Sequence, residues 1–205
     1  MALTTVSAKE AVGRVTGTRE ATGEPMVQLT LFQSLLIREK FEWVLQKATE
    51  VGVAQIVPVL TARGLVRTKQ IEDNKLDRWH RIVAEAAEQS HRGRIPKIEQ
   101  AILFADVFSR FVGFDRLLIA APGQTASLHE VLQGIGRKDP AIALLIGPEG
   151  GLTPVEVEHL RGAGAEMVHL GPRVLPARRA AVVAAGLLLS RAGDLDAGKP
   201  APPVP

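Results

Sequence analysis

Apolar side chains recur along this chain with two periods, one typical of helices and the other of strands. Residues 38–52 place them at intervals of three and four, which predicts a helix with one buried face and Gly52 as its C-terminal cap. Residues 74–90 repeat the pattern, and Gly93 is expected to end that helix. Further helices are expected at 127–133, from residue 154 onward and over 177–191.

Several short apolar runs between these helices do not alternate with polar residues, which indicates strands covered on both faces. Pro58 lies within the first run and cannot donate to a ladder, so it should sit at a strand end, an edge or a bulge. Because helix and strand alternate from residue 40 onward, the pattern predicts an α/β domain with a mostly parallel sheet and flanking helices. The runs cover 54–60, 116–121, 141–146 and 166–171.

The two ends of the chain differ from this central pattern. Residues 1–32 read as short strands, too little sequence for a closed domain of their own. We assign residues 33–193 to the α/β domain and expect residues 194–205, which are rich in Pro and Ala, to be a disordered tail. No apolar run approaches the ~18 residues of a membrane span. No apolar leader is recognised, and the absence of cysteine fits a reducing cytoplasm.

Charge is distributed unevenly along the chain. The net charge is only +3, yet residues 63–97 hold nine Lys or Arg against five Asp or Glu, a local charge of +4. Two interpretations are open: an anionic partner, with nucleic acid first, or a solvated helix face. Aromatic residues make up 4% of the chain and none is tyrosine, so a stacking platform for single-stranded bases is poorly supplied.

Three loops directly follow predicted strands and combine Gly with Pro: residues 119–125, 146–154 and 170–179. In open parallel sheets, ligands bind beyond the carboxyl ends of the strands, so these loops are the candidate site. None of them is a phosphate-binding Walker loop or a dinucleotide fingerprint. The five histidines have no zinc-site spacing, and no metal site is expected.

The second loop, Gly-Pro-Glu-Gly-Gly at 147–151, leads into a predicted helix start. Thr153, Pro154 and Glu156 form a capping box with proline at the first helical position. The glycines permit close approach of a backbone or a ligand, or else a tight turn without a ligand. Glu149 either anchors the loop by accepting backbone hydrogen bonds or orients a substrate.

Arginines gather in the third loop and at the start of the helix after it, at positions 173, 178 and 179. No acidic residue occurs from Gly171 to Ser190. Guanidinium groups beside a ligand crevice suit phosphate contacts, whereas the alternative is an ordinary charged surface.

Three stretches together resemble one family. They are FEWVLQKATEVGVAQIVPVLTAR (41–63), RIVAEAAEQSHRGRIPKI (81–98), and LLIGPEGGLTPVEVEHL with VHLGPRVL (within 144–175). They are similar to the RsmE-type ribosomal RNA methyltransferases of the SPOUT superfamily, which methylate N3 of a uridine in small-subunit (16S) ribosomal RNA. The resemblance extends from about residue 25 to 195. It implies a trefoil-knotted α/β domain, a homodimer and a small-subunit ribosomal RNA partner.

The resemblance also implies that S-adenosylmethionine binds in the knot. The matching cofactor positions are Ala121, Gly147, Pro148, Glu149, Gly150, Leu170, Gly171, Pro172, Leu175 and Ala180. Arg173 is the candidate for stabilising the reacting base or positioning a phosphate. Arg63, Arg92, Arg94 and Arg178 are the candidates for RNA contacts.

The chain departs from the family pattern in two places. Only the last strands of the family's small N-terminal PUA-like barrel are expected, within residues 1–32. After LGPRVL the family continues Arg-Thr-Glu-Thr-Ala, whereas this chain has Pro176, Ala177, Arg178, Arg179 and Ala180. Pro176 lacks an N–H, and Arg178 reverses a charge near a cationic cofactor. The sequence is therefore also compatible with a catalytically silent RNA- or ribosome-binding protein, or with an enzyme acting on another RNA.

Overall fold

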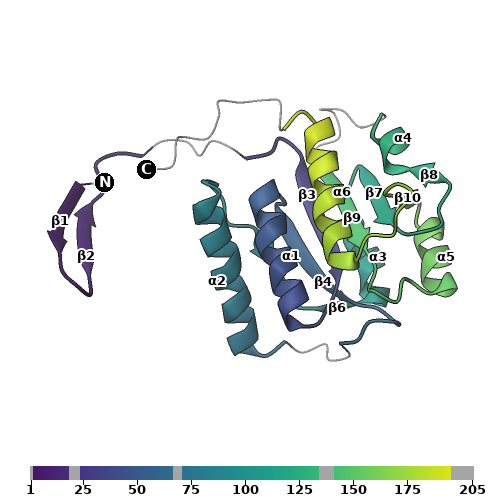
Figure 1. Cartoon of the computed structure of the whole chain (residues 1–205), viewed down its shortest axis with the longest axis horizontal. Helices are drawn as coiled ribbons and strands as arrows, with labels where there is room; N and C mark the ends of the chain where they lie inside the picture. Colours follow the sequence, from purple (N-terminus) through teal and green to yellow (C-terminus); the bar gives the residue numbers. More distant parts are fainter. Residues whose placement is uncertain (1, 19–23, 67–70, 134–140, 195–205) are drawn as a thin grey trace.

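A computed structural model describes residues 2–18, 24–66, 71–133 and 141–194. Its centre is a sheet with the strand order β5-β4-β3-β9-β7-β10-β8, in which β6 also pairs with β4 (Figure 1). Every described pairing within this sheet is parallel. The strands are β3 Gln28–Ser34, β4 Gln55–Leu60, β5 Lys97–Ile98, β6 Ile102–Leu103, β7 Arg116–Ala120, β8 Ala126–Ser127, β9 Ala141–Ile146 and β10 Glu166–His169.

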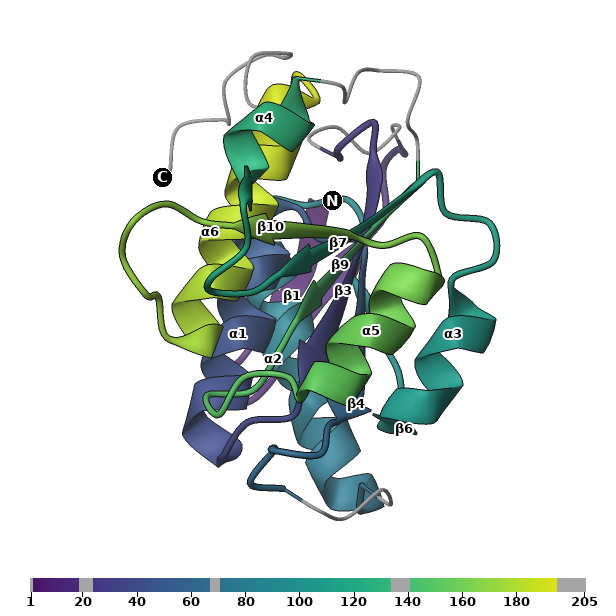
Figure 2. The same cartoon turned by 90° about the vertical axis from the view of Figure 1, so that its right-hand side faces the viewer.

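Helices cover both faces of the sheet, with α1, α2 and α6 on one side and α3 and α5 on the other (Figure 2). The alternating side chains of β3 show the division: Leu31 packs with the α1 and α6 side, and Phe32 packs with the α3 and α5 side. The predicted α/β class is thus confirmed. The helices are α1 Arg38–Val51, α2 Asp73–Gln89, the short 3₁₀ turn Phe104–Asp106, α3 Val107–Arg110, α4 Leu128–Leu132, α5 Pro154–Gly162 and α6 Ala177–Arg191.

The sheet order reverses direction at its middle. After β7 the chain forms β8 at the edge of the sheet, then β9 between β3 and β7, and then β10 between β7 and β8. Helix α6 then returns across the sheet and packs on α1 as well as on β3 and β9. This return is compatible with the SPOUT-type fold, and the knotted threading itself stays a prediction.

Pro58 and the end of the second helix were the subjects of two local predictions. Pro58 lies inside β4 opposite Gln33, but on its other side β5 ends at Ile98 and β6 begins at Ile102, so its missing donor faces a break in pairing. The prediction that Gly93 ends the second helix is wrong. Helix α2 ends at Gln89, and His91 takes the positive φ of 56°.

The expected boundary after residue 32 falls inside β3, and this boundary is wrong. Strand β3 pairs with β4 and β9 and is almost wholly buried, so residues 28–34 belong to the α/β domain. The N-terminal strands β1 Ala2–Val6 and β2 Ala11–Arg14 form a separate antiparallel hairpin whose residues are all exposed (Figure 1). Whether this hairpin is PUA-like stays a prediction. Of the predicted disordered tail 194–205, only Asp194 is described.

Candidate functional site

A hollow of about 140 Å³ lies at the carboxyl ends of β7 and β10, where parallel sheets bind ligands. The first and third predicted loops and the start of α6 form its walls. It brings together seven of the residues that the sequence singled out: Ala121, Leu170, Gly171, Pro172, Arg173, Leu175 and Ala180. Its small side chains leave room for a ligand, and the exposed segment 171–174 forms its mouth.

The loop after β10 is held by a hydrogen bond to the last residue of that strand. His169 lines the hollow, and its Nδ1 accepts a hydrogen bond from the Gly171 N–H at 3.0 Å. A second hollow of about 330 Å³ lies on the α5 side and shares the wall formed by Ala121 and Pro122. Arg63 and Arg161 are among the residues that line it.

The Gly-Pro-Glu-Gly-Gly loop does not line the first hollow. Packing within the protein explains why glycine occupies three of its positions. A Cβ on Gly147 would meet Leu152 Cγ at 3.2 Å, and one on Gly150 would meet Arg63 Cβ at 3.3 Å. Gly151 has φ +68° and donates to the Pro148 carbonyl at 2.9 Å, which closes a turn. The close approaches that the glycines permit are therefore made, in the first instance, by this chain itself.

Glu149 is anchored, but by a side chain and not by the next helix start. The Lys40 ammonium on α1 donates to Glu149 Oε1 at 2.8 Å. Burial acts to raise the pKa of Glu149. Hydrogen bonds from Lys40 and from the backbone N–H of Glu149, together with the charge of Lys40 and a smaller contribution from Arg178, outweigh burial and bring the pKa below its usual value. The carboxylate therefore stays ionised and ties the loop to α1.

The capping box that the sequence predicts at α5 is confirmed. Thr153 Oγ1 accepts from the Glu156 N–H at 3.2 Å, and Glu156 Oε2 accepts from the Thr153 N–H at 2.7 Å. Glu156 has a further role, because its Oε1 accepts from the Ala62 N–H at 2.9 Å, and only 5% of the residue is exposed. One buried carboxylate thus links the loop after β4 to the loop after β9.

The arginines near the hollow differ in their surroundings. Arg173 is exposed at its mouth. Arg178 is half-buried in the first turn of α6, close enough to Glu149 to lower the pKa of that carboxyl. Arg179 is exposed beside it. The first turn of α6 contains no acidic residue, so these cations oppose the helix dipole unless an anion lies nearby.

The prediction that Arg92 faces RNA is wrong. Its side chain is only 4% exposed and pairs with Glu24 at 2.7 Å. Its Nη1 also donates to the Thr49 and Val53 carbonyls, at 2.9 and 2.8 Å. Arg92 therefore joins the segment before β3 to the C-terminal end of α1. Arg94 is exposed, and its role in RNA contacts stays a prediction.

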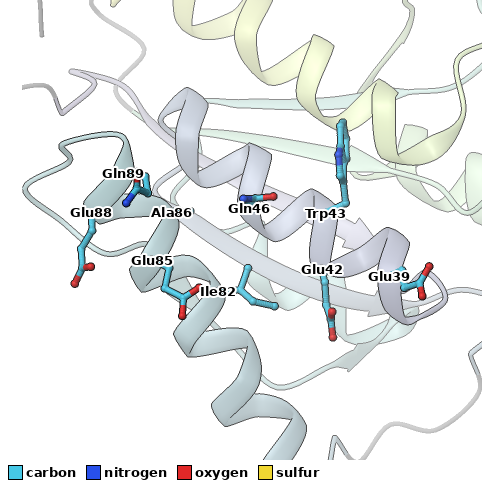
Figure 3. A pocket seen from close by; sticks show the side chains of 9 residues that line it. All are labelled: Glu39, Glu42, Trp43, Gln46, Ile82, Glu85, Ala86, Glu88 and Gln89. Atoms are coloured by element: carbon cyan, nitrogen blue, oxygen red, sulfur yellow. The ribbon is translucent and has the colours of Figure 1, made fainter. Parts of the chain in front are cut away.

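The basic segment 63–97 does not form a uniformly basic face. A hollow of about 560 Å³ lies between helices α1 and α2, and four glutamates line it: Glu39, Glu42, Glu85 and Glu88 (Figure 3). Arg78 is also paired, since its Nε and Nη2 donate to Glu42 at 2.7 and 2.8 Å. This side of α2 would repel phosphates. Two of the counted cations, Arg67 and Lys69, lie outside the described residues.

Sequence reasoning missed two contributors to the site. Lys40 was not singled out from the sequence, and its partner Glu149 lies 109 residues away. Glu156 was assigned only to its cap, although it also binds Ala62. Neither contact has a local signal. Across the described parts of the chain, no group of acidic or histidine side chains could hold a metal, and no helix is long and apolar enough to cross a membrane.

Comparison with known proteins gives consistent matches. The RNA methyltransferase domain family matches residues 23–189. Ribosomal RNA small subunit methyltransferase E of Bacillus subtilis is 33% identical over 143 residues, which are 67% of this chain and 56% of that protein. The namesake from Mesomycoplasma hyopneumoniae is 30% identical over 159 residues, which are 78% of this chain and 68% of that protein.

A solved structure agrees in fold. The ribosomal RNA small subunit methyltransferase E of Neisseria gonorrhoeae, bound to S-adenosyl methionine, has a TM-score of 0.75 at 28% identity, covering 93% of this chain and 77% of that one.

The chain spans about half to two thirds of the length of the curated relatives it matches, between 47% and 68% for the first three. Because the family match covers well over half of the chain, this protein belongs to the RNA methyltransferase domain family.

Proposed function

We propose that this chain is an S-adenosylmethionine-dependent methyltransferase that acts on N3 of a uridine in small-subunit (16S) ribosomal RNA. The observation that carries the proposal is the hollow at the carboxyl ends of β7 and β10, which gathers seven residues singled out from sequence. The relatives named ribosomal RNA small subunit methyltransferase E support the RNA class and the target subunit. The proposed place of action is the cytoplasm.

The residues around the hollow fit a nucleoside-containing ligand. Backbone groups of Leu170 to Pro172 and the small side chains of Ala121 and Ala180 allow close contact with flat rings. At about 140 Å³ the hollow is below the usual ~300 to 1,000 Å³ of ligand pockets. It would therefore hold part of the cofactor, and the rest would lie at the mouth. When bound, S-adenosylmethionine supplies a methyl group already activated by its sulfonium.

The chain's own residues would then position the acceptor. The N3 atom of uracil carries a proton, so the reaction gains from a group that stabilises the anion formed when that proton leaves. Arg173 stands exposed at the mouth of the hollow and is the candidate for this role. Arg63, Arg94 and Arg178 are the candidates for phosphate contacts.

The proposed enzyme is a homodimer. Helix α6 and the neighbouring α1 expose Val183, Leu187 and Trp43, although both helices also contribute to the core. Such apolar side chains on adjacent helices suit an interface between two copies. The exposed hairpin β1–β2 is proposed to belong to a PUA-like part that contributes to RNA binding.

One observation favours a second candidate, a catalytically silent RNA- or ribosome-binding protein. Helix α6 begins after Pro176 with two arginines, and Arg178 would place a cation near a cationic cofactor. Against this, Glu149 is ionised and close enough to offset part of the charge of Arg178. An enzyme with another RNA target is the third candidate.

Calorimetry and RNA mapping separate the three candidates. Titration of the protein with S-adenosylmethionine should give measurable binding, and absence of binding at millimolar ligand would leave only the silent protein. Mass mapping of ribosomal RNA from cells that lack the gene should show one unmethylated uridine in the small subunit. An unchanged small-subunit pattern, with S-adenosylmethionine still bound, would point to another RNA.

A further inference from the structure

Two loops from non-adjacent strands are joined at the carboxyl edge of the sheet. The loop after β4 contains Ala62 and Arg63, and the loop after β9 contains Gly150 to Thr153. Strand β3 lies between β4 and β9 in the sheet, so contacts between these loops bridge the end of β3. The bridge has two parts, one made by the side chain of Glu156 and one made by the side chain of Arg63.

The first part is the buried carboxylate of Glu156, whose two oxygens accept from the Ala62 and Thr153 N–H groups at 2.9 and 2.7 Å. The second part is the guanidinium of Arg63. Its Nη1 donates to the Gly150 and Leu152 carbonyls, both at 3.3 Å. Gly150 also approaches the Arg63 backbone so closely that an added Cβ would lie 3.4 Å from the Arg63 carbonyl oxygen. Arg63 is thus packed against the loop as well as bonded to it.

We propose that Arg63 is a positioning residue that holds the Gly-Pro-Glu-Gly-Gly loop in the form needed for ligand binding. This inference rests on the proposed function for its ligand, but the bridge itself does not. Carbonyl groups in a glycine loop have few other restraints, and a guanidinium that binds two of them narrows the loop's conformations. Lys40 acts on the same loop from the α1 side through Glu149, so the loop is held from both faces of the sheet.

The competing role for Arg63 is a direct phosphate contact. A guanidinium committed to two carbonyls has less freedom to bind a phosphate, and the two roles predict different losses. If Arg63 contacts a phosphate, its replacement should lower the affinity for RNA and the salt dependence of that affinity, and should leave cofactor binding without RNA unchanged. A positioning residue would weaken cofactor binding even when no RNA is present.

The test compares Arg63→Ala and Arg63→Lys with Arg161→Ala in the full chain. Arg161 is a matched control because it lines the same hollow as Arg63, yet it bonds Glu158 and Gln124 and not the loop. Hydrogen exchange of peptides covering 147–153 is measured without ligand, and S-adenosylmethionine affinity is measured by calorimetry. Thermal unfolding checks that each variant is folded.

Arg63→Ala should speed exchange in 147–153 and raise the Kd for S-adenosylmethionine, each by about tenfold, the size expected for one lost charge-assisted hydrogen bond. Arg63→Lys should recover part of both effects, and Arg161→Ala should show neither. Unchanged exchange in Arg63→Ala would overturn the proposal. So would an S-adenosylmethionine affinity of Arg63→Ala equal to that of the wild type, which is the result expected for a phosphate contact. If the wild type bound no cofactor, the proposed function would fail, while the exchange measurement would still decide the role of Arg63.

Discussion

The two edges of the central sheet use charged side chains in opposite ways. At the amino edge, Arg92 is buried and bonded to Glu24, Thr49 and Val53. At the carboxyl edge, Arg173 is exposed at the mouth of a hollow, and Arg63 lies on the surface of a loop. A parallel sheet brings helix ends and crossover loops to both edges, but only the carboxyl edge collects the loops that bind ligands.

The difference shows why arginines of one sequence window have unlike roles. Arg92 and Arg63 both lie in the basic segment 63–97, and sequence alone gives them the same chemistry. The fold places Arg92 where three chain segments converge. Its buried charge therefore needs a partner inside the protein, and Glu24 supplies it. Arg63 reaches the carboxyl edge, where it stays exposed and donates to two carbonyls of the loop after β9.

Replacement of Arg92 should have the largest effect. Arg92→Ala removes the ionic partner of Glu24, whose side chain is only 16% exposed, and it removes the side-chain hydrogen bonds to the Thr49 and Val53 carbonyls. The free energy of unfolding should fall by about 3 kcal/mol, as for other broken buried ion pairs. Urea denaturation measures this. Arg94→Ala serves as the control, because Arg94 contributes only its backbone N–H to Glu24 and should change stability by less than about 0.5 kcal/mol. Equal losses in both variants would contradict the contrast.

Replacement of Glu24 should have a smaller effect that depends on pH. Burial acts to raise the pKa of Glu24. The hydrogen bond and charge of Arg92, together with hydrogen bonds from the Arg94 and Gly93 backbone N–H groups, outweigh burial, and the folded-state pKa lies below the usual 4.5. The ionised carboxylate therefore contributes stability above pH 4.5, and this contribution disappears as the pH falls through the lowered pKa.

Glu24→Gln keeps the size of the side chain but weakens its charge-assisted hydrogen bonds, and it should destabilise the protein by about 2 kcal/mol at pH 7. The difference from wild type should shrink as the pH falls below 4.5. Denaturant titrations of both proteins between pH 7 and pH 3 measure it, and a difference that stays constant over this range would exclude the ion pair as its cause.

At the carboxyl edge, a substitution should affect ligand binding more than stability. Ala121 lies on the wall shared by the two hollows and is not fully buried. Ala121→Leu should narrow the first hollow and weaken S-adenosylmethionine binding at least about tenfold, or about 1.4 kcal/mol. Unfolding free energy should change by less than about 1 kcal/mol. Ala121→Gly is the control that keeps the hollow open, and calorimetry that finds Ala121→Leu binding as tightly as wild type would remove this hollow from the site.

The smallest effect is expected at the exposed ion pair of the carboxyl edge. Lys40 and Glu149 are 36% and 31% exposed, so Lys40→Ala should reduce unfolding free energy by no more than about 1 kcal/mol. Addition of 1 M NaCl to the wild type should remove most of that difference, because salt screens exposed pairs. A loss as large as that of Arg92→Ala, measured in the same buffer, would mean that the two edges do not differ.

Local features were predictable because their causes are local. The apolar repeat of residues 38–52 gave α1, and the glycine after it adopts a positive φ of 111°. The capping boxes at Ser127 and Thr153 follow from side chains three residues apart. The end of α2 was misplaced because His91, which is neither Gly nor Asn, takes the positive φ that Gly93 was expected to supply.

The candidate site was predictable only in part. Residues of the first and third loops meet at one hollow because β7 and β10 are neighbours, and the short apolar runs already indicated parallel strands. The second loop follows β9 but does not line that hollow, and nothing in its Gly-Pro-Glu-Gly-Gly sequence shows that Arg63 would pack against it. The order of strands in the sheet decides such neighbours, and that order has no local signature.

The α/β class, the main helices and strands, the cap at α5 and the family of the chain could be read from the amino-acid sequence, since each is encoded in nearby residues or in a whole-chain pattern. Three contacts emerge only in the folded chain: Arg92 with Glu24, Glu149 with Lys40, and Arg63 with the glycine loop. The most distant of these pairs is 109 positions apart in the sequence. Burial and charge pairing depend on which segments the sheet brings together, and residue type alone does not specify that.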